Sequence, residues 1–342
     1  MDKARLRTLL DRFAGMHILV LGDFFLDRYL VLDPVLAERS LETGLVARQV
    51  VGIRNSPGAG GTVTNNLCAL GAHVTALGVI GEDGMGNELL RALDGLGVDT
   101  SAMVVSTERY TPTYIKPMER ISPDVERETE RLDIKNRTPT PARLVEQVVD
   151  AFRRRAPDAQ GIIIADQVPE EGCGTVTRQV RLAVDELSMS CPQQVIAVDS
   201  RNRVGAFQNQ ILKPNENEAW AAVHGAPPET PPSLEESAAC GLTLHKRTGR
   251  PLFVTVGERG ILSLAGGEVT HVPSVPVPGP IDIVGAGDSA MAALVLSLCA
   301  GASPPEAAQV ANLVASITIQ QLGTTGTATC DQVLARNQEA FE

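Results

Sequence analysis

Residues 282–288 read Asp282-Ile283-Val284-Gly285-Ala286-Gly287-Asp288, and the apolar, alanine-rich run Ser289–Leu298 follows at once. The small residues do not form a strong helix but the run after them does, so the glycines mark a loop that becomes a helix N-terminus. Backbone N–H groups without intrahelical acceptors converge there, and the helix dipole adds partial positive charge. The pattern therefore predicts an anion-binding turn at Gly285, Ala286 and Gly287.

Asp288 lies inside this predicted anion site, where a carboxylate would repel a bound phosphate. We interpret it as a base that accepts a proton from a hydroxyl while that hydroxyl attacks a phosphoryl group. The amides of residues 285–287 would stabilise the developing charge. The alternative is a tight turn at Gly285 and Gly287, with Asp288 as a helix cap.

The composition limits the class of protein. A chain of 342 residues with 43% hydrophobic content can bury a large core, as one α/β domain or one domain with a small appendage. Its 30 Lys and Arg against 41 Asp and Glu give a net charge of −11, which argues against nucleic acid or an anionic membrane as the main partner.

The expected compartment is the cytoplasm. The six cysteines are widely spaced, so we expect reduced side chains and no zinc site. The N-terminus lacks an apolar signal core, and the longest apolar run, around 290–300, is too short to span a bilayer.

Strand and helix patterns alternate along the chain. This alternation predicts one domain over residues 1–342, a three-layer α/β/α fold with a mostly parallel sheet and helices on both faces. After Leu322-Gly323-Thr324 we expect only a short tail. Strands are predicted at 17–21, 73–80, 161–165, 194–198, 211–212 and 252–256, and helices at 63–70, 87–96, 174–188, 215–223, 233–247 and 305–321.

Two segments depart from this alternation. Leu45–Val51 alternates like an exposed strand, and Thr111–Lys116 is another strand-like piece. We expect a small β-sheet that projects from the main domain as a lid or dimer surface, inserted at about 29–55 and 108–120.

Polar residues follow the first predicted strand. Ligands of open α/β sheets bind outside the carboxyl ends of such strands, so Asp23 and Asp27 fall where hydroxyls of a substrate could be held. For Asp27 the alternative is a solvated loop or a cap. The turn 57–62 is rich in glycine and enters a helix, which suits close approach to a ligand or a simple connector.

Three further segments carry candidate nucleotide-binding groups. Asn215 and Glu218 are three residues apart at a strand-to-helix junction, and Glu218 could order a Mg²⁺-bound water or simply favour the helix N-terminus. The small residues of the turn 255–260 could admit a purine or a phosphate. Asn312 could line an adenine pocket or be a satisfied polar residue between two helices.

The order of these motifs resembles the phosphofructokinase-B, or ribokinase-like, family of sugar kinases over nearly the whole chain. The resemblance implies ATP and Mg²⁺ as cofactors, Asp288 as the general base, and Gly285, Ala286 and Gly287 as the anion hole. It also implies that Asp282 lies near a loop that binds a monovalent cation, such as K⁺, in some relatives. The nucleotide-site residues that it implies are Asn215, Glu218, Thr255, Gly257, Gly260 and Asn312, and the sugar-site residues are Asp27 and the 58–62 turn, including Gly58 and Thr62.

Within the family, the chain is most similar to the bacterial heptose 7-phosphate kinases. This resemblance implies that Lys116 meets a phosphate already present on the sugar, and the alternative is an exposed lid lysine. The segments that carry it are Gly22–Tyr29, Pro112–Lys116, Arg131–Asp133 and Ala311–Thr324.

The chain departs from the family pattern mainly in the acceptor half. Thr62 stands where the family has a sugar-binding Asn, and Ala59 replaces a glycine of the heptose kinases. Residues 167–170 replace a Tyr-x-Lys-Gly type of sequence. Ile283-Val284 replaces a Thr-rich pair, which weakens the case for a cation site.

These patterns predict an ATP-dependent kinase that acts on a hydroxyl of a sugar or sugar phosphate, with a heptose 7-phosphate-like acceptor, and a homodimer formed through the lid. Alternative acceptors are ribose, ketodeoxygluconate, a fructose phosphate and a nucleoside. A regulatory protein that binds nucleotide and sugar without turnover is the rival class, and the intact run 285–288 argues against it. A nicotinamide-dependent dehydrogenase is weaker still, because no Gly-x-Gly-x-x-Gly turn follows the first strand.

Overall fold

The computed structural model describes residues 1–122 and 125–341. Its central sheet has eight strands in the order β15-β14-β13-β12-β11-β10-β1-β4. The pairs from β4 to β13 are parallel, whereas β14 and β15 add an antiparallel edge. The strands are β1 (His17–Gly22), β4 (His73–Leu77), β10 (Gly161–Asp166), β11 (Val195–Ser200), β12 (Ile211–Leu212), β13 (Leu252–Thr255), β14 (Ile261–Ala265) and β15 (Glu268–Val272).

Helices cover both faces of this sheet, because successive side chains of each buried strand point to opposite faces. In β1, Ile18 and Val20 enter one core and Leu19 and Leu21 enter the other. The first core packs against α1 (Lys3–Leu10), α2 (Gly60–Ala69), α8 (Ala286–Cys299), α9 (Pro304–Thr318) and α10 (Cys330–Phe341). The second packs against α4 (Ala142–Arg155), α5 (Arg178–Ser190), α6 (Glu216–His224) and α7 (Leu234–Thr248).

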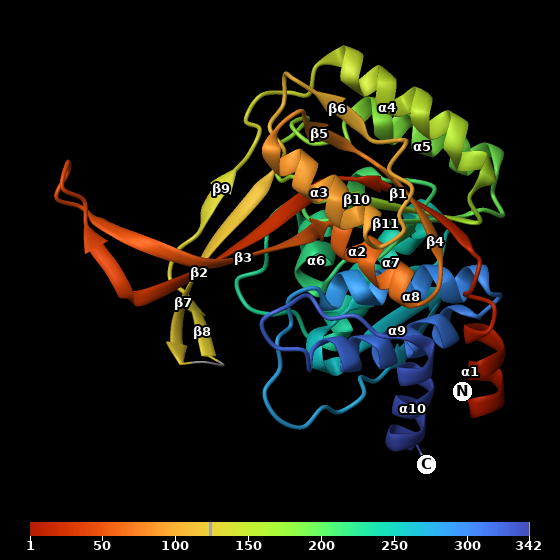
Figure 1. The fold of residues 1–342 in the computed structure, drawn as a ribbon. Helices are drawn as coiled ribbons and strands as arrows, with labels where there is room; N and C mark the ends of the chain where they lie inside the picture. The colour runs from red at the N-terminus through yellow and green to blue at the C-terminus, as the bar shows by residue number, and fades with distance from the viewer. Residues whose placement is uncertain (123–124, 342) are drawn as a thin grey trace.

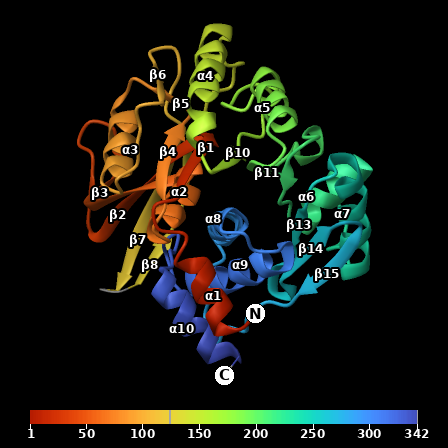
Figure 2. The ribbon, with the colours of Figure 1, turned by 90° about the vertical axis from the view of Figure 1, so that its right-hand side faces the viewer.

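The two helical layers are visible in Figure 2, and the expected three-layer α/β/α architecture is confirmed. The remaining helices are α3 (Gly84–Asp94), which contacts β2, β3 and β5, and the short 3-10 turns η1 (Ala156–Asp158), η2 (Val204–Ala206) and η3 (Gly257–Arg259). In the described part of the chain, no helix has the length and apolar character needed to cross a membrane.

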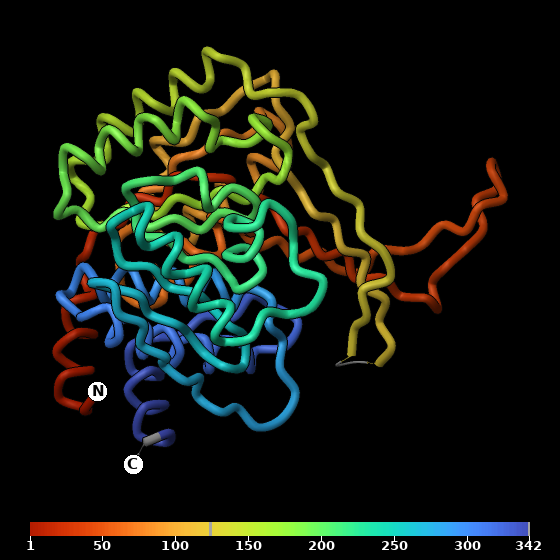
Figure 3. Tube along the Cα trace, turned by 180° about the vertical axis from the view of Figure 1, so that it is seen from behind, coloured from red at the N-terminus to blue at the C-terminus, as the bar shows by residue number. Residues whose placement is uncertain are grey.

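A second sheet projects from the body, as expected, and we call it the lid. Its strand order is β3-β2-β7-β8, and β9 pairs with β7. Figure 1 shows the β2–β3 hairpin reaching far from the body, and Figure 3 shows the same projection from behind. The lid strands are β2 (Phe24–Arg39), β3 (Val46–Ala59), β7 (Thr113–Ser122), β8 (Val125–Glu128) and β9 (Leu132–Ile134), and β5 (Val79–Gly81) pairs with β6 (Val104–Ser106) apart from it.

Three details of the sequence prediction need correction. The expected short tail after Thr324 is wrong, because α10 begins at Cys330 and contacts α1 and α9. The helix expected at 87–96 begins at Gly84, where the side chain of Asp83 accepts a hydrogen bond from the Gly86 amide and caps it. The helix expected at 174–188 is α5, which begins later, at Arg178. The six cysteines are free, as expected.

Candidate active site

The turn predicted at residues 285–287 lies at the N-terminus of α8, and its anion-binding role stays a prediction. Gly285 is the N-cap residue, with φ 84° and ψ −2°, and no side chain caps the helix. A Cβ on Gly285 would lie 3.3 Å from side-chain carbons of Thr62 and Thr325, so both the backbone conformation and the space favour glycine. An uncapped helix start with little side-chain bulk suits the binding of a phosphate.

Asp288 lies in the first turn of α8 and is partly buried. Loss of hydration raises the pKa of Asp288 to about 7, and the negative charge of Asp199 adds to this rise. Lys213 and Arg201 oppose it. A carboxylate with a pKa near neutrality can act as a proton acceptor under physiological conditions.

A buried ion pair lies beneath this turn. Nζ of Lys213, just after β12, lies 2.9 Å from Oδ2 of Asp199 at the end of β11. Burial acts to lower the pKa of Lys213, but the charges of Asp199, Glu218 and Asp288 together outweigh it and raise that pKa, so the lysine stays protonated. The same Nζ would lie 3.6 Å from a Cβ on Gly287, so a fixed cation stands against the anion turn.

Asn215 and Glu218 form a reciprocal cap at the start of α6. The Asn215 side chain accepts from the Glu218 amide at 2.9 Å, and Oε2 of Glu218 accepts from the Asn215 amide at 2.8 Å. Burial, followed by the charge of Asp199, raises the pKa of Glu218 to about 7. The helix-terminal role is therefore real, while Oε1 of Glu218 makes no hydrogen bond within the described residues and faces the same charge cluster as Asp288.

The turn after β13 lies beside this cap. The Thr255 amide donates to Pro214 O at 3.0 Å, which places Thr255 next to Asn215. Gly257 has φ 60° and open space around its Cβ position. Gly260 has φ 97°, and a Cβ there would lie 2.2 Å from Val272 O, so close backbone packing requires this glycine.

Asn312 and Asp282 both hold loops. The Asn312 amide nitrogen donates to Val272 O at 3.0 Å and Pro273 O at 2.9 Å, at the start of the loop that leads to the anion turn. Asp282 accepts from the amides of Val284 and Gly323 at 3.0 and 3.1 Å. Asn312 is a satisfied polar residue, but its partner is this loop and not a second helix.

On the acceptor side, the lid contributes a charged pair. Asp27 on β2 is buried, and its Oδ1 lies 3.4 Å from Nζ of Lys116 on β7. Lys116 also donates to Tyr29 Oη at 3.2 Å, so it is not an exposed lid lysine. Burial raises the pKa of Asp27, and Lys116 opposes that rise. A Cβ on Gly58 would lie 3.0 Å from Asp27 Oδ2, which explains the small residue there.

The start of α2 shows what the departures from the family pattern do. The Thr62 hydroxyl donates to Pro57 O at 3.4 Å, while its methyl group faces Gly285. The Thr62 hydroxyl therefore has a hydrogen-bond acceptor within the protein. Ala59 adopts φ 54° and ψ −117°, a conformation that favours glycine, at the position where the heptose kinases have one.

Asp23 is structural and does not offer its carboxylate to a substrate. Oδ2 accepts from the amides of Gln167 and Val168, and Oδ1 accepts from the amide of Thr175, all within 3.0 Å. Burial, followed by the charge of Asp166, raises the pKa of Asp23 to about 6. The carboxylate anchors the loop 167–175 to the end of β1.

The two halves of the site face each other. The charge of Asp27 contributes a little to the raised pKa of Asp288, so the lid carboxylate and the α8 carboxylate lie within electrostatic range of each other. Arg201, after β11, acts electrostatically on Asp288, Glu218 and Tyr114, and it therefore lies between the halves. Sequence reasoning assigned no role to Asp199, Arg201 or Lys213, although all three follow buried strands as Asp23 does.

Residues 29–330 match the model of the pfkB family of carbohydrate kinases. The chain belongs to this family.

Curated relatives of this pfkB chain are named bifunctional protein HldE. The protein from Trichlorobacter lovleyi is 29% identical over 340 residues, which cover 98% of this chain and 65% of the relative. The one from Hyphomonas neptunium is 30% identical over 328 residues, covering 94% and 63%. The chain thus spans less than two thirds of the length of these relatives.

Solved structures share the fold of the pfkB chain. Arabidopsis thaliana ribokinase, complexed with ribose and ATP, superposes with a TM-score of 0.67 at 20% identity, covering 94% of this chain and 98% of that one. Phosphofructokinase-2 from Escherichia coli, in complex with fructose-6-phosphate, gives 0.68 at 17% identity, covering 96% and 100%. The ribokinase-like fold predicted from the motif order is confirmed.

Proposed function

We propose that the protein is an ATP-dependent kinase that phosphorylates a hydroxyl of a sugar or sugar phosphate. The observation that carries this proposal is Asp288, a carboxylate with a pKa of about 7 at the uncapped N-terminus of α8. Membership of the pfkB carbohydrate kinases supports the reaction class.

In the proposed reaction, Asp288 accepts the proton of the acceptor hydroxyl while the hydroxyl oxygen attacks the terminal phosphoryl group of ATP in line with the leaving oxygen. The amides of Gly285 and Gly287 and the ammonium of Lys213 stabilise the charge that develops on that group, while the Ala286 amide, which donates to Ile283 O at 3.2 Å, would have to be released to join them. We assign the nucleotide to the surface formed by Asn215, Glu218, Thr255, Gly257, Gly260 and Asn312.

Magnesium would reach this site with the nucleotide. The described residues contain no cluster of three or more side chains suited to hold a metal. Mg²⁺ characteristically uses one or two carboxylates together with substrate phosphates and water. Glu218 fits this role through its free Oε1, directly or through a water, and when bound the ion would neutralise phosphate charge.

We propose no step through a monovalent cation. Both carboxylate oxygens of Asp282 already accept backbone amides, and Ile283 and Val284 bring no side-chain oxygen to the loop. The Asp282 region therefore stays only a weak candidate for K⁺.

For the acceptor, we propose a heptose 7-phosphate-like sugar, with Asp27 and Gly58 at its hydroxyls and Lys116 near its phosphate. The relatives named HldE and the buried position of Lys116 support this choice. The engaged hydroxyl of Thr62 favours a different set of sugar contacts from the family pattern, so ribose, ketodeoxygluconate, fructose phosphates and nucleosides belong in the test.

We also propose a homodimer that forms through the lid. The β2–β3 hairpin exposes the apolar side chains of Val35, Leu36, Leu41 and Leu45, and Val35 is 90% exposed. An apolar hairpin that stands away from the body is a surface that a second copy of the chain would cover.

The test is ATP consumption coupled to ADP detection, across heptose 7-phosphate, fructose phosphates, ribose, ketodeoxygluconate and nucleosides, with Asp288→Asn alongside. Turnover of one acceptor, lost in the variant, would establish reaction and substrate together. ATP binding without turnover of any acceptor would instead favour a regulatory binding protein.

A further inference from the structure

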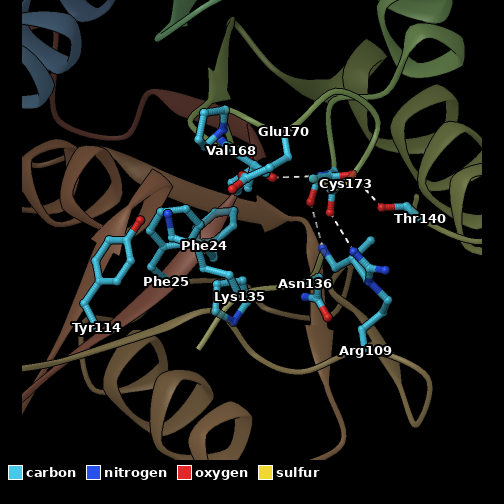
Figure 4. A pocket seen from close by; sticks show the side chains of 16 residues that line it. Phe24, Phe25, Arg109, Tyr114, Lys135, Asn136, Thr140, Val168, Glu170 and Cys173 are labelled. Carbon is cyan, nitrogen blue, oxygen red and sulfur yellow. Dashed lines mark hydrogen bonds between the residues drawn. The ribbon is translucent and has the colours of Figure 1, made fainter. Parts of the chain in front are cut away.

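A pocket opens at the base of the lid, between β2, β7 and the loop 167–175. Figure 4 shows it from close by, with the rings of Phe25 and Tyr114 on one side. The two rings meet edge to face, with centroids 5.2 Å apart. None of the roles proposed above for ATP, Asp288 or Lys116 uses this pocket.

The pocket adjoins the acceptor half of the site. Phe25 lies two residues before Asp27 on β2, so the two side chains share a face of the strand. Tyr114 is the direct partner of Asp27 in the β2–β7 register. Arg201, which lowers the pKa of Asp288, acts on Tyr114 as well. A sugar held at Asp27 would therefore lie beside the pocket.

Glu170 is the unexplained group in this pocket. Its Oε2 is sealed from solvent and has no hydrogen-bond partner among the described residues. A buried carboxylate oxygen without a donor is costly, so a donor, a water or a ligand hydroxyl that takes its place, is expected from outside the chain.

The neighbouring polar groups do not supply that donor in this structure. Arg109 donates to Thr138 O and Cys173 O. Both ends of the Asn136 amide bond the backbone of Tyr110. Lys135 lies across the pocket from Glu170 (Figure 4), its Nζ is 5.8 Å from the centroid of the Tyr114 ring, and it makes no ion pair within residues 1–122 and 125–341.

These groups define the chemistry of a ligand. One oxygen on the ligand must donate to Glu170, and another must accept from Lys135, while the aromatic rings require an apolar surface. Neighbouring hydroxyls of a sugar meet all three conditions, because each hydroxyl both donates and accepts and the C–H faces are apolar. A phosphate would face the negative charge of Glu170, and juxtaposed like charges repel each other.

We propose that this pocket is a subsite for hydroxyl groups of the acceptor other than the reacting hydroxyl and the phosphorylated one, with Glu170 as hydrogen-bond acceptor and Lys135 as donor. The proposal rests on the proposed function, because it concerns the same acceptor. The proposal also explains the departure from the family pattern at residues 167–170, where Glu170 brings a carboxylate that the Tyr-x-Lys-Gly pattern lacks.

The test compares Glu170→Gln with Glu171→Gln, the same change one residue along, where the carboxylate is exposed and pairs with Arg181. For the acceptor found in the panel, we expect Glu170→Gln to raise KM about 10-fold or more. The kcat and the KM for ATP should stay within about twofold. Glu171→Gln should leave all three unchanged. Lys135→Gln, with exposed Lys246→Gln as its control, is the second variant and should also raise the acceptor KM.

Acceptor binding without nucleotide, measured by calorimetry on the full chain with ribose, fructose and a heptose, separates the two proposals. Sugar binding that is weakened in Glu170→Gln supports the subsite even if no acceptor is phosphorylated. If Glu170→Gln and Lys135→Gln both turn over the acceptor with an unchanged KM, the subsite proposal is overturned and the kinase proposal stands. An equal effect of Glu171→Gln, or no sugar binding to the wild type, overturns it too.

Discussion

Nζ of Lys213 lies 2.9 Å from Oδ2 of Asp199, and this buried pair stands directly against the Gly287 turn. Asp199 raises the pKa values of Asp288 and Glu218, whereas Lys213 lowers both. The pair therefore sets the charge balance of the whole transfer site.

Replacing Lys213 by Met should remove a cation that offsets phosphate charge and should leave Asp199 uncompensated. We expect kcat/KM for ATP to fall roughly 100-fold or more. The acid limb of the kcat profile should move to higher pH, because Lys213 now lowers the pKa of Asp288. Steady-state kinetics from pH 5.5 to 9 would measure both, with exposed Lys246→Met as the control. An unshifted acid limb would contradict the proposed coupling.

Asp288→Asn should reduce kcat by about two to four orders of magnitude, because the base is lost. It should also stabilise the fold at alkaline pH. The folded-state pKa of Asp288 is raised, so the native state binds more protons than the unfolded state between about pH 4 and 7, and the stability contributed by this group is lost as pH rises through 7.

Chemical unfolding at pH 5 and pH 8 tests this second effect. We expect the variant to gain about 1 to 2 kcal/mol over wild type at pH 8, a figure reduced for the partial exposure of the side chain, and less at pH 5. A difference between the proteins that does not change with pH would rule out a buried ionisation at this position.

Gly285 and Gly301 offer a matched pair at the two ends of α8, with φ values of 84° and 85°. Alanine at either position should cost about 1 kcal/mol of stability, because of the left-handed backbone. Only Gly285→Ala should also weaken ATP binding and turnover, since its Cβ would push against Thr62 and Thr325 at the anion turn. Equal ATP affinity in the two variants would show that the turn does not bind the nucleotide.

Ala59→Gly should stabilise the protein. The backbone at φ 54° and ψ −117° strains an alanine by roughly 1 to 3 kcal/mol, and the added flexibility of glycine costs less, about 0.5 to 1 kcal/mol. The net gain should be about 1 kcal/mol in denaturant unfolding. Ala69→Gly, at the other end of α2, should show the opposite sign because it lies in regular helix.

Charged residues in place of Val35 and Leu41 should shift the proposed dimer toward monomer in sedimentation velocity at working concentrations. The fold should survive, because both side chains point into solvent in the hairpin. A wild-type chain that sediments only as monomer would remove the dimer proposal.

The sequence predicted most of the architecture because the buried parallel strands are short apolar runs that alternate with helices. It did not reveal β14 and β15, although Gly266-Gly267 between them, with φ 61° and 86°, is a typical hairpin turn. The helix α10 was missed because a polar, threonine-rich stretch separates it from α9, and only a short segment follows that stretch.

For the candidate site, motif spacing pointed to Asp288 and Glu218, but their pKa values depend on Asp199 and Lys213, which come from different strands. Only the folded sheet shows that the strand ends that carry Asp199 and Lys213 lie side by side. For Asp23 we used the rule that polar residues at the ends of buried strands face the ligand. The same rule would have identified Asp199 and Lys213 as candidate site residues. It failed at Asp23 itself, because backbone amides of the loop 167–175 donate hydrogen bonds to that carboxylate.

Helices α1 and α10 pack against each other, and the first and last described residues lie on the same side of the body, away from the lid hairpin (Figure 1). The two described ends are therefore near each other in space. A short linker between them, with new ends opened at the hairpin tip near Gly44, should give a circular permutant of residues 1–342 with the same strands, helices and active-site groups.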